Sequence, residues 1–397
     1  MTGNRFHLTP LDTYLFRDGR PFEMRRARPL SPLPPPSTLY GALRHMLLEY
    51  HGISYVSYKA RTVPDGLYEI LGPRDGVGEL AIVGPFFRDL EHTYLPWPAD
   101  LVFSEDDCLY QHPGTVTGEA KYPDGLAPFA LFKPGAAAPY TKSVKRHENA
   151  DWIKAAQWWQ SANLSAYLLG NDFSPQPAEP LYSLEPHTGI TRSAATRTAV
   201  DGQLFTVDFT RLADNVSFEF EIENGAVQFP EIWNTSVGGE RRPVLLKAME
   251  GTEHTTLRDS IRSSIAALTR NGSVSFRLFL VTPARFVRTW KPECFIEGDT
   301  FQDNDVEYTL RAAAMAKGPA FSGWDLALQE PRSSIRTVPA GSVYFLTAKS
   351  DLDADTLADR IFKRFWFQPG LLAENNHDRK MGFARTLIGV WNNERSS

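Results

Sequence analysis

The spacing of apolar residues predicts strands in both halves of the chain. Apolar and polar residues alternate in LFTVDF (204–209) and VSFEFEI (216–222), which is the period of a strand with one buried face. Asn224-Gly225 follows the second run and predicts a hairpin turn. Further strands are expected over residues 5–16, 81–83, 276–281, 343–346 and 387–391, with the strand at 81–83 ending at Gly84-Pro85.

Helices are predicted where apolar residues recur every three or four positions. Ser37 is the expected N-cap of the first helix, and Gly52 is its expected end. Its apolar face holds Leu39, Leu43, Met46, Leu47 and Tyr50. Other helices are expected over 151–169, 257–268 and 357–365. Strands and helices do not alternate regularly, so the pattern favours the α+β class.

Length and composition describe a globular chain of two or three domains. The chain has 397 residues, with 42% hydrophobic and 22% charged residues. Its formal net charge is -5, so we expect any nucleic-acid site to be a local basic patch or one completed by partner subunits. Cys108 and Cys294 are the only cysteines, which suits a reducing cytosol. No apolar run approaches a membrane span, and we expect a cytoplasmic protein.

The segment 8–44 concentrates positive charge. It reads LTPLDTYLFRDGRPFEMRRARPLSPLPPPSTLYGALR, and residues 1–48 hold seven arginines and three acidic residues, a net charge of +4. Guanidinium groups fork onto phosphate oxygens, so RNA-backbone binding is one interpretation. A solvated arginine-rich loop is the other, and the residues alone favour it slightly. The candidate RNA contacts are Arg17, Arg20, Arg25, Arg26 and Arg28 in the loop, and Ser37 and Arg44 on the helix after it.

Three further segments carry weaker signals. TRSAATRT (191–198) places Arg192 and Arg197 among small and hydroxyl residues that suit a phosphate, although a plain surface loop is the commoner explanation. Glycine lets the backbone near Phe383 approach a ligand, but a tight turn before the last strand explains it equally. The candidate RNA contacts in this glycine-containing segment are Gly382, Phe383 and Arg385. The third segment is a small basic cluster, whose candidates are Lys142, Lys145 and Arg146.

Trp152, Trp158 and Trp159 have the aromatic rings that stack on bases, but core packing is the better expectation for Trp159. No cofactor, metal or catalytic residue is expected. The histidines lack the spacing of metal ligands, and the segment from Asp351 lacks the glycine and glutamate of a calcium loop. The glycine-rich segment near the C-terminus lacks the lysine of a nucleotide P-loop.

Several motifs together resemble one family across nearly the full chain. They are LDTYLFRDGRPF (11–22), PSTLYGALR (36–44), GPFF (84–87), YLPWPADLV (94–102), Gly189-Ile190 to Gly202, GGE (238–240), FRLFLVTP (276–283), SGWD (322–325), VPAGSVY (338–344) and 382–390. In this order they resemble RAMP subunits of the type III-B CRISPR (Cmr) effector complex. The similar subunit is the third Cmr subunit, which lies beside the large palm-domain subunit.

The resemblance implies two ferredoxin-like (RRM-like, RAMP) domains with long loop insertions, which we place at residues 1–203 and 204–397. It implies a non-catalytic subunit that holds the 5′ repeat-derived handle of the CRISPR RNA (crRNA). Its implied partners are the crRNA, the large subunit, the backbone RAMP subunits and, indirectly, target RNA. It favours RNA contact for the arginine candidates. Ala384 replaces a glycine that is commoner in RAMP proteins, which weakens the expectation of close backbone contact there.

Two alternatives remain open. Some RAMP proteins cut precursor RNA by metal-independent acid–base chemistry, and His45 or His187 would be the proton-transfer group. An adaptor that contacts only protein is the other alternative.

Overall fold

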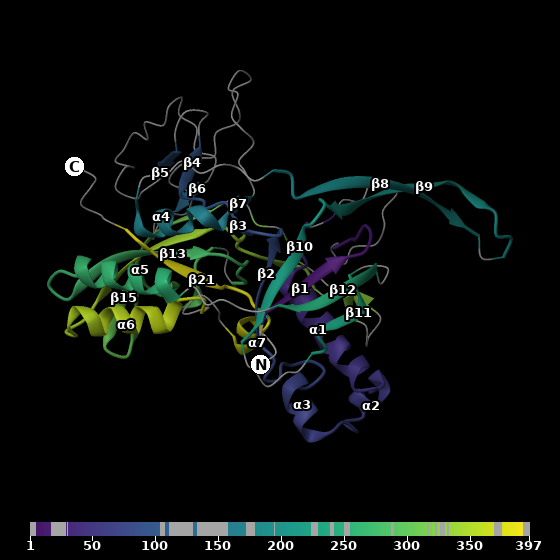
Figure 1. Cartoon of the computed structure of the whole chain (residues 1–397), viewed down its shortest axis with the longest axis horizontal. Coiled ribbons are helices and arrows are strands. Elements are labelled where there is room, and N and C mark those ends of the chain that lie inside the picture. The colour runs from purple at the N-terminus through teal and green to yellow at the C-terminus, as the bar shows by residue number, and fades with distance from the viewer. Residues whose placement is uncertain are drawn as a thin grey trace, which may run out of the picture. The chain divides into compact units, whose positions relative to one another are not determined.

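The structure is a computed structural model (Figure 1). The described residues are 5–16, 29, 31–103, 108–110, 130–132, 158–171, 179–193, 195–223, 229–238, 242–249, 255–286, 290–315, 318, 320–321, 324–325, 330–331, 333–368 and 375–391. The chain forms two compact units. Unit 1 comprises Met1–Glu91, Glu179–Gly251 and Pro319–Arg336, and unit 2 comprises His92–Ala178, Thr252–Gly318 and Thr337–Ser397.

These units do not follow the contiguous boundary that we placed between residues 203 and 204. Strand β1 (Arg5–Pro10) pairs on one side with β10 (Ser217–Ile222) and on the other with β12 (Arg242–Met249). Both partners follow residue 203, so the sheet of unit 1 draws strands from both sides of that boundary. Local sequence patterns carry no information on such long-range pairing.

Unit 1 is built on an antiparallel sheet in the order β11-β12-β1-β10-β2. The bounds of β11 are Ile232–Val237, and those of β2 are Ile82–Arg88. Phe6 and Leu8 of β1 and Phe218 and Phe220 of β10 are buried, because alternate residues of each strand face the core. The strand predicted over residues 216–222 is therefore confirmed, but Ser217 and Glu219 on its other face are also buried.

The predicted strand at residues 81–83 does not end at Gly84-Pro85, because β2 continues to Arg88. Glu219 of β10 pairs with Phe86, and Glu221 pairs with Val83. Two residues of β2 therefore lie opposite one residue of β10. This β-bulge takes the proline out of the regular ladder, where its missing N–H would break a hydrogen bond.

Helix α1 (Pro36–Tyr50) follows β1, and α2 (Tyr55–Lys59) and α3 (Asp65–Leu71) come next. The predicted apolar face is largely confirmed, since Leu39, Leu43, Met46 and Leu47 are buried. Ser37 is not the N-cap. Pro35 holds that position, and no side chain caps the helix, which begins with proline.

A long hairpin also belongs to unit 1. Strands β8 (Tyr182–Arg192) and β9 (Ala199–Leu212) form a two-stranded sheet, and Figure 1 shows them extending away from the main sheet of that unit. Two short strand pairs complete the unit: β16 (Ala320–Phe321) with β19 (Ile335–Arg336), and β17 (Trp324–Asp325) with β18 (Glu330–Pro331).

The main sheet of unit 2 has the order β14-β15-β20-β13-β21, and β6 (Ala130–Phe132) also pairs with β15. Its strands are Thr300–Asp303, Val306–Met315, Val343–Lys349, Ser273–Leu280 and Thr386–Val390 in that order. Helices α5 (Thr255–Leu268) and α6 (Ala354–Phe365) pack together against this sheet (Figure 1). The strands predicted at 276–281, 343–346 and 387–391 and the helices predicted at 257–268 and 357–365 are confirmed.

Smaller elements complete unit 2. They are β3 (Thr93–Pro96), β4 (Leu101–Phe103), β5 (Cys108–Tyr110), β7 (Trp158–Gln160), the turns η3 (Ser161–Asn163) and η5 (Glu293–Phe295), α4 (Leu164–Leu169) and α7 (Asn376–Lys380). Of the predicted helical region 151–169, the structure describes residues 158–169. This part holds strand β7 and only one short α-helix, α4. Trp159 is buried against Tyr167, as expected for core packing.

Candidate nucleic-acid interface

The tip of the β8–β9 hairpin brings Arg192 and Arg197 together. The Nε of Arg192 donates to the carbonyl oxygen of Arg197 at 2.9 Å. Two backbone hydrogen bonds close the turn, from Ser193 to Thr198 at 2.9 Å and from Arg197 to Ser193 at 2.8 Å. Both arginines are exposed. The tip therefore presents two cations and several hydroxyl groups on an ordered turn, a composition that suits phosphate oxygens.

The base of the hairpin is attached to the chain just before residues 17–28, which hold the five loop arginines and are called the arginine-rich segment below. The backbones of Tyr14 and Thr210 exchange two hydrogen bonds, of 2.9 and 2.8 Å. Leu15 packs with Val207 and Phe209 in a buried apolar cluster. Leu15 lies two residues before Arg17, so the chain that leads into the arginine-rich segment is fixed against β9.

The far end of that segment is tied to the same point. The hydroxyl of Tyr14 donates to the carbonyl oxygen of Pro32 at 2.6 Å, although the two residues are 18 positions apart. The residues on either side of the segment are thus held together. Arg17, Arg20, Arg25, Arg26 and Arg28 lie outside the described residues, and their contact with RNA stays a prediction.

An ion-pair network stiffens the hairpin base. Arg211 on β9 donates to Glu185 on β8 at 2.7 Å and to Asp12 at 3.1 Å. The Arg211 hydrogen bond, followed by one from His187, lowers the pKa of Glu185 from its usual 4.5 to about 2. Asp12 also lies 3.7 Å from Arg242, whose guanidinium covers the Phe209 ring. The network joins both hairpin strands to the segment that follows β1.

Sequence reasoning did not predict this network. A signal was present: in the alternating run through residues 204–212, Arg211 shares a face with Phe209 and Val207. An arginine on an otherwise apolar strand face calls for a charged partner. The partner Asp12 lies 199 positions away, so only the fold identifies it.

Arg44 has partners within unit 1. Its guanidinium donates to the carbonyl oxygens of Pro73 at 2.8 Å and Gly76 at 3.2 Å, and also contacts the Tyr58 hydroxyl. Arg44 therefore holds the loop after α3, which does not favour the predicted RNA contact. Ser37 is half-buried in the first turn of α1.

The C-terminal segment requires a correction. Phe383 and Arg385 are each 1% exposed. The Arg385 guanidinium donates to the carbonyl oxygens of Phe367 at 3.0 Å and Arg379 at 3.1 Å. Gly382 accepts a hydrogen bond from the Thr282 hydroxyl at 2.7 Å. The side chains of Phe383 and Arg385 thus belong to the core of unit 2, because they are buried and Arg385 is bonded to its backbone, and they are not exposed to RNA.

Ala384 in this segment has a φ of +57°, in the left-handed region. This backbone conformation favours glycine, which explains on steric grounds why glycine suits the position. Ala384 is also buried, so close approach of an RNA backbone is not supported. Lys142, Lys145 and Arg146 lie outside the described residues, and their role also stays a prediction.

The two histidines considered for proton transfer each face a carboxylate. His45 lies 3.2 Å from Glu49 on α1, and His187 lies 2.7 Å from Glu185 on β8. Within the described ranges, no three or more His, Cys, Asp or Glu side chains gather to hold a metal ion. Of the helices that the structure describes, none is long and apolar enough to cross a membrane.

Several motifs that carried the family resemblance meet in the core of unit 2. Asp100 of YLPWPADLV pairs with Arg277 of FRLFLVTP at 2.8 Å. Gly341 of VPAGSVY accepts a hydrogen bond from the backbone of Ala99 at 2.8 Å. These motifs therefore have structural roles, and their residues need not contact RNA.

The chain matches the model of a known protein family. The family model described as CRISPR-associated protein (Cas_Cmr3) matches residues 6–391. The protein is accordingly a subunit of type III-B CRISPR effector complexes. The chain belongs to the Cmr3 family, whose members are structural subunits and generally non-catalytic. The resemblance read from the sequence motifs is thereby confirmed.

Solved structures with similar chains come from type III CRISPR complexes. One is a chain of the type III-B Cmr-beta complex bound to cognate target RNA and AMPPnP, with 15% identity, a TM-score of 0.44 and coverage of 91% of this chain and 89% of that one. Another belongs to the Csm3–Csm4 subcomplex of a type III-A complex, with 10% identity, a TM-score of 0.33 and coverage of 89% and 94%. A search of curated proteins found no match.

Proposed function

We propose that the protein is the non-catalytic RNA-binding subunit that holds the 5′ repeat-derived handle of crRNA in a type III-B effector complex. The observation that carries the proposal is the attachment of the arginine-rich segment to the β8–β9 hairpin through Tyr14 and Thr210. It links two sets of arginines that are far apart in sequence. Cations at several points along the chain suit a single-stranded RNA that is held by backbone contacts.

Both units also support the ferredoxin-like assignment. In unit 1, strands β1, β2, β10 and β12 follow one another in sequence, and the sheet order β12-β1-β10-β2 is last, first, third, second. In unit 2, the order β21-β13-β20-β15 is again last, first, third, second. This is the order of the ferredoxin-like βαββαβ fold. Unit 1 retains the first helix, α1, and unit 2 retains the second, α6.

Docking on the large palm-domain subunit and on the backbone RAMP subunits completes the proposal, with target RNA contacted indirectly. The net charge of -5 supports such an arrangement, because a groove completed by partners needs only local positive charge on this chain.

The proposal is tested with effector complexes assembled on labelled guide RNA. The variants are the triple Arg17/Arg20/Arg26→Ala and the double Arg192/Arg197→Ala. Removing one arginine that neutralises a phosphate should reduce the slope of log affinity against log salt by about 0.7. The matched control is Arg74→Ala with Arg258→Ala, two exposed arginines outside the proposed interface.

If both arginine variants retain the guide RNA as well as the control does, the proposed RNA interface is rejected. Crosslinking of the handle only to other subunits would favour the protein adaptor instead. Specific cleavage of a repeat-containing transcript, abolished in His45→Ala or His187→Ala, would reject the non-catalytic role.

A further inference from the structure

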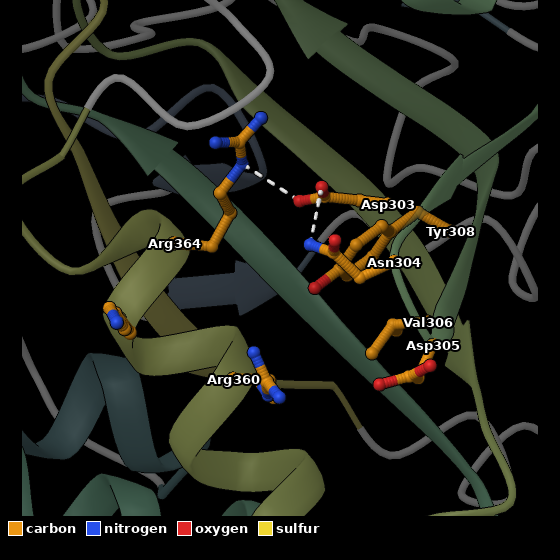
Figure 2. A pocket seen from close by; sticks show the side chains of 8 residues that line it. Asp303, Asn304, Asp305, Val306, Tyr308, Arg360 and Arg364 are labelled. Carbon is orange, nitrogen blue, oxygen red and sulfur yellow. Dashed lines mark hydrogen bonds and ion pairs between the residues drawn. The ribbon is translucent and has the colours of Figure 1, made fainter.

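A pocket lies in unit 2 between helix α6 and the turn that joins β14 to β15 (Figure 2). Its volume is about 220 Å³. The turn contributes Asp303 and Asp305, and the helix contributes Arg360, Lys363 and Arg364. None of these residues was among the predicted RNA contacts. The pocket shares no residue with the arginine-rich segment or the hairpin.

The geometry of the helix sets the cationic side of the pocket. Arg360, Lys363 and Arg364 occupy positions three and four residues apart, so they share one face of α6. Helix α6 is held in place by its buried apolar face and by Asp353, which caps its N-terminus through the Thr356 backbone N–H at 3.0 Å. The three cations are thus presented by a rigid element.

The charges in the pocket are only partly balanced. Arg364 pairs with Asp303 at 3.1 Å, as Figure 2 shows. Arg360 and Lys363 are exposed and form no hydrogen bond or ion pair with the other residues that the structure describes. Asp305 is an exposed carboxylate on the opposite wall. Two cations face one carboxylate, which leaves the pocket with a net positive charge.

The floor of the pocket carries a hydroxyl group. Tyr308 is only 1% exposed, and its side chain runs from β15 toward α6 in Figure 2. Its hydroxyl borders the pocket and makes no hydrogen bond within the described part of the chain, so it is accessible to a ligand there. Burial raises the pKa of Tyr308, so the hydroxyl remains a neutral donor at physiological pH.

We propose that this pocket binds a phosphate group of a nucleotide or of an RNA strand. Arg360 and Lys363 supply charge to the phosphate oxygens, and Tyr308 donates a hydrogen bond from the floor. Asp305 repels additional negative charge, so the pocket favours a single phosphate over a polyphosphate.

The test measures binding of inorganic phosphate, AMP and a short single-stranded RNA to the full chain by calorimetry. Arg360→Gln should weaken AMP binding by about fivefold, and Tyr308→Phe by about threefold. Asp305→Asn should strengthen it by about twofold, because it removes a repelling charge. Arg258→Gln removes an exposed arginine of α5 outside the pocket and should leave binding unchanged.

Each outcome decides the proposal. Binding of AMP and phosphate with this pattern identifies a phosphomonoester site, and the same pattern with RNA alone identifies a backbone phosphodiester. Absence of binding for all three ligands, or equal effects of Arg360→Gln and Arg258→Gln, overturns it. The Arg192/Arg197→Ala variant should leave AMP binding unchanged, which separates this pocket from the proposed handle site.

Discussion

Arg277 and Asp100 form an ion pair at 2.8 Å in the core of unit 2, and both side chains are 0% exposed. The other oxygen of Asp100 accepts a hydrogen bond from the Tyr167 hydroxyl at 2.7 Å. The Arg277 guanidinium also lies over the Tyr167 ring. Together these contacts join β13 to the segment around Asp100 and to helix α4, which carries Tyr167. They explain why an arginine and an aspartate occur within otherwise apolar motifs.

Removing one partner of this pair should destabilise the protein strongly. Asp100→Asn leaves a buried guanidinium without its counter-charge, and we expect a loss of about 3–5 kcal/mol in the free energy of unfolding. Denaturant unfolding measures this loss. Arg262→Gln, which breaks the exposed pairs with Asp355 and Asp359, is the control and should cost about 1 kcal/mol or less. Equal losses in the two variants would contradict the structural role.

Gly341 should not tolerate a side chain. Its φ is +93°, and a Cβ there would lie 2.4 Å from the carbonyl oxygen of Trp97. We expect Gly341→Ala to lower the free energy of unfolding by about 2 kcal/mol or more, through backbone strain and this clash. Gly66→Ala on α3 has open space and is the control; helix propensity should make it neutral or stabilising by about 0.5–1 kcal/mol. A shift in melting temperature compares the two.

The Tyr14 hydroxyl should affect both stability and RNA retention. Tyr14→Phe removes the hydrogen bond to Pro32 that ties the two ends of the arginine-rich segment. We expect a cost of about 1 kcal/mol in unfolding free energy, since one hydrogen bond is removed and the ring remains. Guide RNA retention should fall as well, because the proposed contacts are less well ordered. Normal retention in a variant with the expected stability loss would show that this tie does not serve RNA binding.

The hairpin base should weaken in acid. The pKa of Glu185 is about 2 in the folded protein, below its usual 4.5. A lowered carboxyl pKa stabilises the folded state fully above 4.5, and this contribution is lost as the pH falls from about 4.5 to 2. A carboxyl NMR titration measures the Glu185 pKa directly. In Arg211→Gln the pKa should return toward 4.5, and an unchanged value would contradict the assigned cause.

The sequence by itself determined the local elements and the family. The strand over residues 216–222 and the helices over 257–268 and 357–365 depend on neighbours within a few positions, and such patterns can be read without a fold. The ordered motifs identified the Cmr3 family because they extend over nearly the whole chain. The concentration of arginines between residues 17 and 28 was also plain from composition.

Only the tertiary structure decided which charged residues are buried and which are accessible. Arg385 and Arg192 were both candidate RNA contacts in the sequence. In the structure Arg385 is a core residue, whereas Arg192 lies at an exposed hairpin tip. Other charged residues have partners that are distant in sequence: Asp100 lies 177 positions from Arg277, and Asp12 lies 199 positions from Arg211. The environment of a charge depends on what packs around it in three dimensions, and strand pairing between remote segments sets that packing.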